Sequence, residues 1–180
     1  MKLEEKKISS KDIFEGKVMR VTVDTVELPN GAEARREIVH HRGAVCVLPL
    51  TDDGEVICVR QFRYAHGEVL LEIPAGKLEE GEYDHRSAVL RELSEETGAK
   101  CKELIYLGKL YPSPAIFTEV IHMYLAKGLT FGETHPDDDE FLEVERIPLE
   151  KLKDMIMRGE IYDAKTQVCV LRAYIEMKKA

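Results

Sequence analysis

The segment at residues 76–99 constrains the fold most, because it reads as a loop leading into one short helix bounded by glycine. Within it, Glu92 is followed by Glu95 three positions later and by Glu96 four positions later, so a helix places all three carboxylates on one face. Such like-charge neighbours repel by about 0.2–0.5 kcal/mol, and the negative end of the helix dipole before Gly98 disfavours them further. The arrangement is therefore poor for stability, and a nearby cation would offset the repulsion.

Two interpretations of the glutamates remain open at this point. Mg²⁺ takes oxygen ligands and is commonly held by one or two carboxylates together with substrate phosphates, so the helix can be a metal–phosphate site. The alternative is a solvated acidic helix face, with Arg91 offsetting part of the repulsion by pairing with Glu95.

The residues around the glutamates resemble the signature of the Nudix hydrolases, which has a glycine, a glutamate and then Arg-Glu-apolar-x-Glu-Glu-x-Gly. Eight residues separate Glu82 from Arg91, one more than the family signature has, and the extra residue is expected in the loop before the helix. This departure concerns the role of Glu82 more than the helix carboxylates. The matched positions are Gly76, Glu82, Arg91, Glu92, Leu93, Glu95, Glu96 and Gly98.

The resemblance implies an enzyme that hydrolyses a pyrophosphate bond with Mg²⁺, or Mn²⁺ as an alternative. Glu92 and Glu96 stand one helical turn apart and are the expected direct metal ligands, with Glu95 as a further or water-mediated ligand. By resemblance, the main-chain carbonyl of Ala75 joins the metal shell. Arg91 is expected to orient a glutamate rather than to touch the substrate.

Further stretches are similar to the ADP-ribose pyrophosphatase branch, which implies release of AMP and ribose 5-phosphate from ADP-ribose. By position, Arg63 would contact the phosphates and Arg36 would line the ADP-ribose pocket, while Glu72 and Pro114 would also belong to the substrate site. Guanidinium groups suit this task because they bind phosphate in a fork and stack on rings. Surface arginines on strands are the alternative. The similar stretches are residues 28–31, 36–39, 60–63, 72–76, 111–114 and 162–166.

A general base is also needed, and the acidic tract at residues 137–140 is its expected source. Glu140 precedes Phe141-Leu142-Glu143-Val144, which looks like the strand that follows the base candidate in this branch. A solvated acidic loop is the alternative interpretation of the tract.

Strand patterns predominate in the chain, with one central helix at about residues 84–97 and two late ones at 149–158 and 163–177. The apolar run at residues 43–50 is expected to be a central strand. An α+β fold follows, an α/β/α sandwich with a mixed sheet, as the Nudix resemblance also implies. We expect Leu90, Leu93 and Thr97 to form an inward stripe away from the glutamates.

Two domains are expected: an N-terminal strand or hairpin subdomain at residues 1–42 and a Nudix domain at 43–180. The strands at residues 17–28 and 32–41, joined by the Asn30-Gly31 turn, form the hairpin. The family implies a homodimer, and this subdomain is the expected dimerisation element.

Composition excludes several classes of function. The net charge of −8 argues against nucleic-acid binding, which needs a basic surface. Apolar runs are too short for a membrane span, and the four dispersed cysteines fit buried free thiols in a reducing cytoplasm.

Three other functions remain as alternatives to ADP-ribose hydrolysis. The same chemistry on another nucleoside diphosphate linked to a group X, such as a sugar nucleotide or a dinucleoside polyphosphate, is the nearest. A non-catalytic module that senses ADP-ribose is disfavoured by the full set of carboxylates, and a structural acidic protein by the glycines and arginines around them.

Overall fold

The computed structural model describes residues 2–135 and 140–178. It divides into two compact units, of which the first comprises Met1–Gly43 with Tyr111–Val120, and the second Ala44–Leu110 with Ile121–Ala180. The first unit thus takes in Tyr111–Val120 in addition to the N-terminal segment at residues 1–42.

The first unit is an antiparallel sheet in the order β1-β2-β3, formed by Lys6–Glu15, Arg20–Glu27 and Glu33–His40. The expected hairpin is β2 and β3, and the turn between them has Gly31 at φ 83°, a conformation that glycine adopts without strain. β1 was not expected, because all ten of its residues are exposed and none of the alternation that marks a half-buried strand is present.

The central sheet of the second unit has the order β7-β4-β9-β8, formed by Ala75–Lys77, Ala44–Pro49, Ile121–Phe131 and Ala99–Leu110. β4 is buried at all six positions and runs parallel to β9, which confirms the expected central strand. Its side chains alternate between two cores. Val45 and Val47 pack in one hydrophobic cluster, and Cys46 and Leu48 pack in the other.

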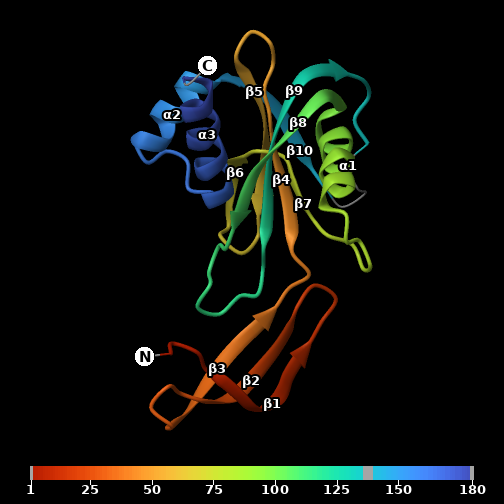
Figure 1. The fold of residues 1–180 in the computed structure, drawn as a ribbon. Coiled ribbons are helices and arrows are strands. Elements are labelled where there is room, and N and C mark those ends of the chain that lie inside the picture. Colours follow the sequence, from red (N-terminus) through yellow and green to blue (C-terminus); the bar gives the residue numbers. More distant parts are fainter. Residues whose placement is uncertain (1, 136–139, 179–180) are drawn as a thin grey trace. The chain divides into compact units, whose positions relative to one another are not determined.

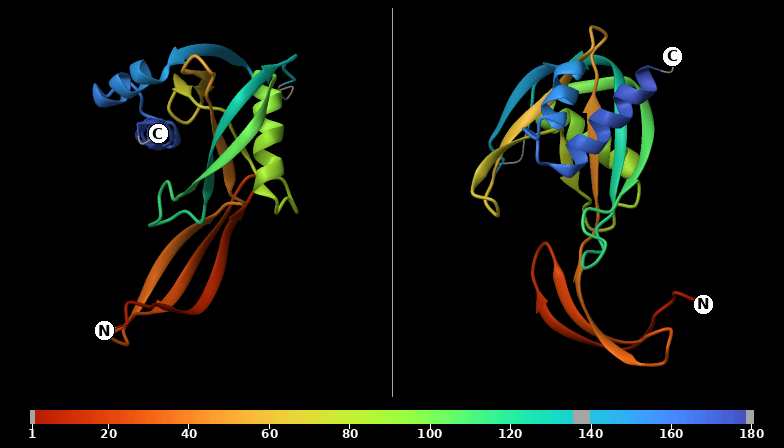
Figure 2. Two further views of the ribbon diagram at one scale, coloured as in Figure 1. Left: turned by 45° about the horizontal axis from the view of Figure 1, so that its top comes forward. Right: turned by 90° about the vertical axis from the view of Figure 1, so that its left-hand side faces the viewer.

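A second sheet in this unit has the order β10-β5-β6, formed by Leu142–Pro148, Glu55–Arg63 and Glu68–Glu72. Three helices complete the unit: α1 at His85–Thr97, α2 at Leu149–Met157 and α3 at Ala164–Met177. Figure 1 shows α1 on one side of the strands and α2 with α3 on the other, and in the right-hand view of Figure 2 α2 and α3 lie in front of the strands. This is the expected α/β/α sandwich.

The buried face of α1 differs from the expected stripe. Leu93 and Thr97 are buried as expected, but Leu90 is 38% exposed, so its inclusion was wrong. Glu92 and Glu96 instead lie on the buried face, beside Leu93. Within the described part of the chain, no helix is long and apolar enough to cross a membrane.

Candidate active site

The loop between β6 and α1 passes directly against the glutamates of α1. β7 pairs with β4, with Gly76 opposite Val45, and this fixes the backbone beside the helix. A Cβ added at Gly76 would lie 1.9 Å from Oε1 of Glu92, so any other residue there would require the Glu92 carboxylate to move. The backbone of Ala75 hydrogen-bonds the carboxylate of Glu96. The expected ligands Ala75, Glu92 and Glu96 therefore lie together.

Both glutamates are costly to keep charged. Glu92 is 7% exposed and Glu96 4%. Burial raises the pKa of Glu92 to about 7, and burial together with the charge of Glu92 raises the pKa of Glu96 to about 8. Oε2 of Glu96 is also buried without a hydrogen-bond partner among the described residues. Burying this oxygen costs free energy, and a bound cation can offset that cost.

Arg91 joins the remaining carboxylates of the signature. Its Nη1 lies 2.8 Å from Oε1 of Glu92 and 2.9 Å from Oε2 of Glu95, and its Nη2 lies 3.3 Å from Oε2 of Glu82. Glu82 also accepts a hydrogen bond from the backbone N–H of Glu79 at 3.0 Å. The extra residue in the loop therefore does not carry Glu82 away from Arg91.

The donor set fits a divalent metal ion. It offers carboxylate oxygens, a buried oxygen without a partner on Glu96, and backbone at Ala75 and Gly76 in direct approach. In the part of the chain that the structure describes, no group of three or more His, Cys, Asp or Glu side chains is arranged so that it could hold a metal ion. Glu92 and Glu95 each direct one carboxylate oxygen to Arg91, which leaves the other oxygen of each carboxylate for a metal ion.

Glu140 also belongs to this neighbourhood. The chain after β9 follows the end of α1, where the N–H of Gly132 donates to the carbonyl of Gly98 at 2.8 Å and the N–H of His135 donates to that of Glu95 at 2.9 Å. Glu140 is half-buried, and its negative charge contributes to the raised pKa values of Glu92 and Glu96. The other members of the acidic tract, Asp137, Asp138 and Asp139, lie outside the described residues.

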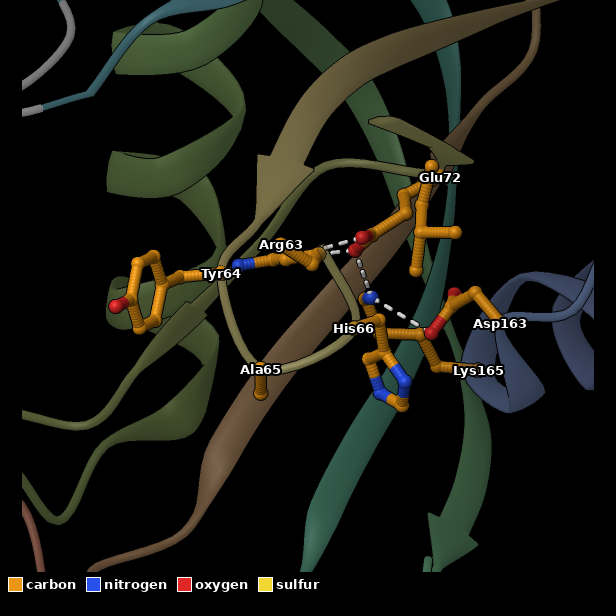
Figure 3. A pocket seen from close by; sticks show the side chains of 8 residues that line it. Arg63, Tyr64, Ala65, His66, Glu72, Asp163 and Lys165 are labelled. Atoms are coloured by element: carbon orange, nitrogen blue, oxygen red, sulfur yellow. Dashed lines mark hydrogen bonds and ion pairs between the residues drawn. The ribbon is translucent and has the colours of Figure 1, made fainter. Parts of the chain in front are cut away.

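A pocket of about 410 Å³ opens between the end of β5, the following loop and the start of α3. Figure 3 shows Arg63, Glu72, Asp163 and Lys165 pointing toward one another in this pocket. The hydrogen bond to Glu72 raises the pKa of Arg63, and the negative charges of Glu72, Asp163 and Glu96 raise it further. The pocket and the glutamate site therefore interact electrostatically. The pocket is lined by Arg63, Tyr64, Ala65, His66, Leu70, Glu72, Asp163 and Lys165.

The two remaining predicted site residues, Arg36 and Pro114, lie in the first unit. Arg36 forms a fork on Glu5, from Nη2 to Oε1 at 2.6 Å and from Nε to Oε2 at 3.0 Å. Pro114 lies in the turn between β8 and β9.

Sequence reasoning did not identify the roles of Lys165 and Asp163 in the pocket. Their stretch at residues 162–166 matches the ADP-ribose pyrophosphatase branch, but nothing in it indicates that the lysine is buried. Glu72 could have indicated a buried lysine, because it is a single acidic residue at the end of an apolar strand. Once buried, its carboxylate needs more positive charge than the half-exposed Arg63 supplies.

Comparisons with known proteins show the family of the chain. The NUDIX domain matches residues 39–167, and the nucleoside diphosphate sugar hydrolase N-terminal domain matches residues 5–39. An ADP-ribose pyrophosphatase of Bacillus subtilis (strain 168) is 46% identical, covering 99% of this chain and 96% of the relative. A methanol dehydrogenase activator of Bacillus methanolicus is 42% identical, covering 98% and 95%.

A solved structure shares the fold. The crystal structure of an ADP compounds hydrolase superposes with a TM-score of 0.86 at 22% sequence identity, covering 99% of this chain and 97% of the other.

Proposed function

The chain belongs to the NUDIX domain family, and we propose that it hydrolyses the pyrophosphate bond of ADP-ribose to give AMP and ribose 5-phosphate. The observation that carries the proposal is the buried pair Glu92 and Glu96, of which Glu92 lies against Gly76, near a pocket that contains Arg63. Carboxylates that are costly to bury and a guanidinium nearby suit a metal-assisted reaction at phosphate.

A divalent metal is the cofactor general to this family, and we propose Mg²⁺ in this protein, with Mn²⁺ as a substitute. Glu92, Glu96 and the carbonyl of Ala75 would hold it, with Glu95 as a further ligand directly or through water. When bound, the ion would neutralise charge on the phosphate oxygens and lower the pKa of a bound water.

Two side chains would then act on the reactants themselves. Glu140 would accept the proton of the attacking water, since its charge acts on both metal-site glutamates and it is half-buried. Arg63 would bind a phosphate oxygen, and Arg91 would orient Glu92 and Glu95.

We further propose that the protein is a homodimer and that Arg36 and Pro114 line the ADP-ribose pocket. Support for the dimer comes from β1, which is exposed throughout and presents three apolar side chains to solvent. These are Ile8, Ile13 and Phe14, each more than half exposed. A mass of one chain in light scattering would refute the dimer. The four free cysteines suit a reducing compartment, and we propose the cytoplasm.

The experiment that tests the proposed function is product analysis with Mg²⁺. ADP-ribose is assayed beside sugar nucleotides, dinucleoside polyphosphates and nucleoside triphosphates, and products are identified by chromatography. The proposal expects AMP and ribose 5-phosphate, with the highest kcat/KM for ADP-ribose. A non-catalytic sensor would bind ADP-ribose and release neither product.

Hydrolysis of a nucleoside diphosphate sugar is the second candidate. The observation that favours it is the match of residues 5–39 to the nucleoside diphosphate sugar hydrolase N-terminal domain. The same panel distinguishes the two, because a higher kcat/KM for a sugar nucleotide than for ADP-ribose would replace the first candidate by the second.

A further inference from the structure

Lys165 is a lysine held away from solvent at the start of α3, where its side chain is only 10% exposed. Its Nζ forms an ion pair with Oε2 of Glu72 and a second with Oδ1 of Asp163, at 3.0 Å. Burial alone would lower the pKa of Lys165, but the charges of these two carboxylates raise it. The lysine is therefore charged inside the pocket of Figure 3.

Glu72 links this lysine to Arg63. The Glu72 side chain is 2% exposed, and it accepts from Nε of Arg63 on Oε1 at 2.7 Å and from Nη2 on Oε2 at 2.7 Å. Oε2 thus lies between two cations. The fork fixes the plane of the guanidinium, and Nη1 has no hydrogen-bond partner within the described part of the chain. Nη1 is the donor that remains for a substrate oxygen.

Lys165 itself stands on a firmly held helix start. Asp163 caps α3 by accepting from the N–H of Thr166 at 2.9 Å, and the hydroxyl of Thr166 accepts from the N–H of Ile73 at 2.9 Å. Ile73 follows Glu72 directly, so the same helix start anchors both ends of the Glu72–Lys165 pair.

We propose that Lys165 is a positioning residue for substrate binding: through Glu72 it holds the guanidinium of Arg63 in place for the diphosphate of the substrate. The proposal rests on the proposed function for the identity of that substrate. Lys165 does not itself touch the reacting groups. It acts by sharing the negative charge of Glu72, so that Arg63 remains free to attract another anion.

Charge balance gives the physical reason. Arg63 and Lys165 carry two positive charges, and Glu72 and Asp163 carry two negative ones. Removing the lysine charge leaves a net charge of −1 in a pocket that has to accept a diphosphate. Arg63 then becomes the main counter-ion of a buried carboxylate, which weakens its attraction for phosphate.

A double-mutant cycle tests this proposal. Lys165→Met and Arg63→Ala are made singly and together, and kcat and KM are measured with ADP-ribose and saturating Mg²⁺. We expect Lys165→Met to raise KM by about tenfold with kcat changed less than about threefold. In the Arg63→Ala background the same substitution should change KM less than about twofold, because its effect passes through Arg63.

A matched control is Lys153→Met. Lys153 also bridges two carboxylates, Glu150 at 2.8 Å and Asp154 at 2.9 Å, but it lies on α2 without a link to Arg63. Its loss should leave KM unchanged. Lys165→Arg, which retains the charge, should keep KM within about threefold of the wild-type value.

Additive effects of Lys165→Met and Arg63→Ala on KM would overturn the proposal, as would a fall in kcat alone. If thermal unfolding shows that Lys165→Met is not folded, Lys165→Gln takes its place in the cycle. Should the wild type not hydrolyse ADP-ribose, the proposed function fails separately. The cycle is then run with the panel substrate that the wild type hydrolyses, and the same outcomes decide.

Discussion

The backbone of Gly76 lies directly against the carboxylate of Glu92: a Cβ on Gly76 would lie 1.9 Å from Oε1 and 2.0 Å from Cδ, so a side chain there would displace the carboxylate. The position of Glu92 on the helix therefore depends on the backbone of the loop before it.

Replacing Gly76 by alanine should displace Glu92 and lower kcat/KM by about 10²-fold, since misplacement of a ligand by about 1 Å is enough for such a loss. The measurement is steady-state kinetics with Mg²⁺ titration, in which the Mg²⁺ requirement should also rise. Gly132→Ala is the matched control, because among the described residues a Cβ there meets only the carbonyl oxygen of Gly98, at 3.7 Å. Equal activity of both variants would contradict the account.

Glu96→Gln should abolish turnover and yet stabilise the metal-free protein. With a pKa of about 8, against an ordinary value of 4.5, Glu96 stays protonated in the folded state while the unfolded chain ionises. The free energy of unfolding therefore falls as pH rises from about 4.5 to 8, and the full loss of stability persists above pH 8. Removing the charge should raise the free energy of unfolding at pH 8.5 by about 1–3 kcal/mol.

The check on Glu96→Gln is denaturant unfolding at pH 5 and pH 8.5 in chelator. The gain in stability should be small at pH 5 and large at pH 8.5. A variant less stable than wild type at pH 8.5 without metal would show that the carboxylate of Glu96 is satisfied by the protein itself.

Glu140→Gln should lower kcat by about 10²-fold or more with little change in KM, because the substitution removes the proton acceptor and keeps the side-chain size. Glu143→Gln is the control, an exposed acid three positions further on, in β10. Near-normal turnover of Glu140→Gln would transfer the role of base to another carboxylate.

Arg63→Ala should act mainly on binding, with KM raised by about tenfold or more, because Nη1 would donate to the substrate in ground and transition states alike. Arg60→Ala serves as the control, since Arg60 lies on the same strand but pairs with Glu145 at 2.8 Å. Unchanged kinetics of Arg63→Ala would remove Arg63 from the site.

Much of this architecture could be predicted from the sequence because its signals are local. The apolar run at residues 43–50 marks β4, and Asp84 and Gly98 mark the ends of α1, where the carboxylate of Asp84 accepts from Arg86 N–H at 3.0 Å and Gly98 has φ 66°. β1 could not be predicted because it is exposed on both faces, so its sequence lacks the apolar–polar alternation of a half-buried strand.

The site was only partly predictable, because burial of charge depends on distant partners. Glu92 and Glu96 were expected to face away from the core, and their burial follows from the approach of β7, which the helix pattern does not contain. The contact of Lys165 with Glu72 joins residues 93 positions apart. Pairing across that distance is set by the tertiary fold, which brings the start of α3 to the end of β6, rather than by any local pattern.

The most direct measurement of the central claim is release of AMP and ribose 5-phosphate from ADP-ribose with Mg²⁺, by wild type and by Glu96→Gln side by side. The account predicts that both products form in equal amounts with wild type, stop with chelator, and are absent with Glu96→Gln. Hydrolysis that persists in Glu96→Gln would contradict the assignment of the buried glutamates, and wild type that cleaves another substrate in preference would contradict the assignment of ADP-ribose.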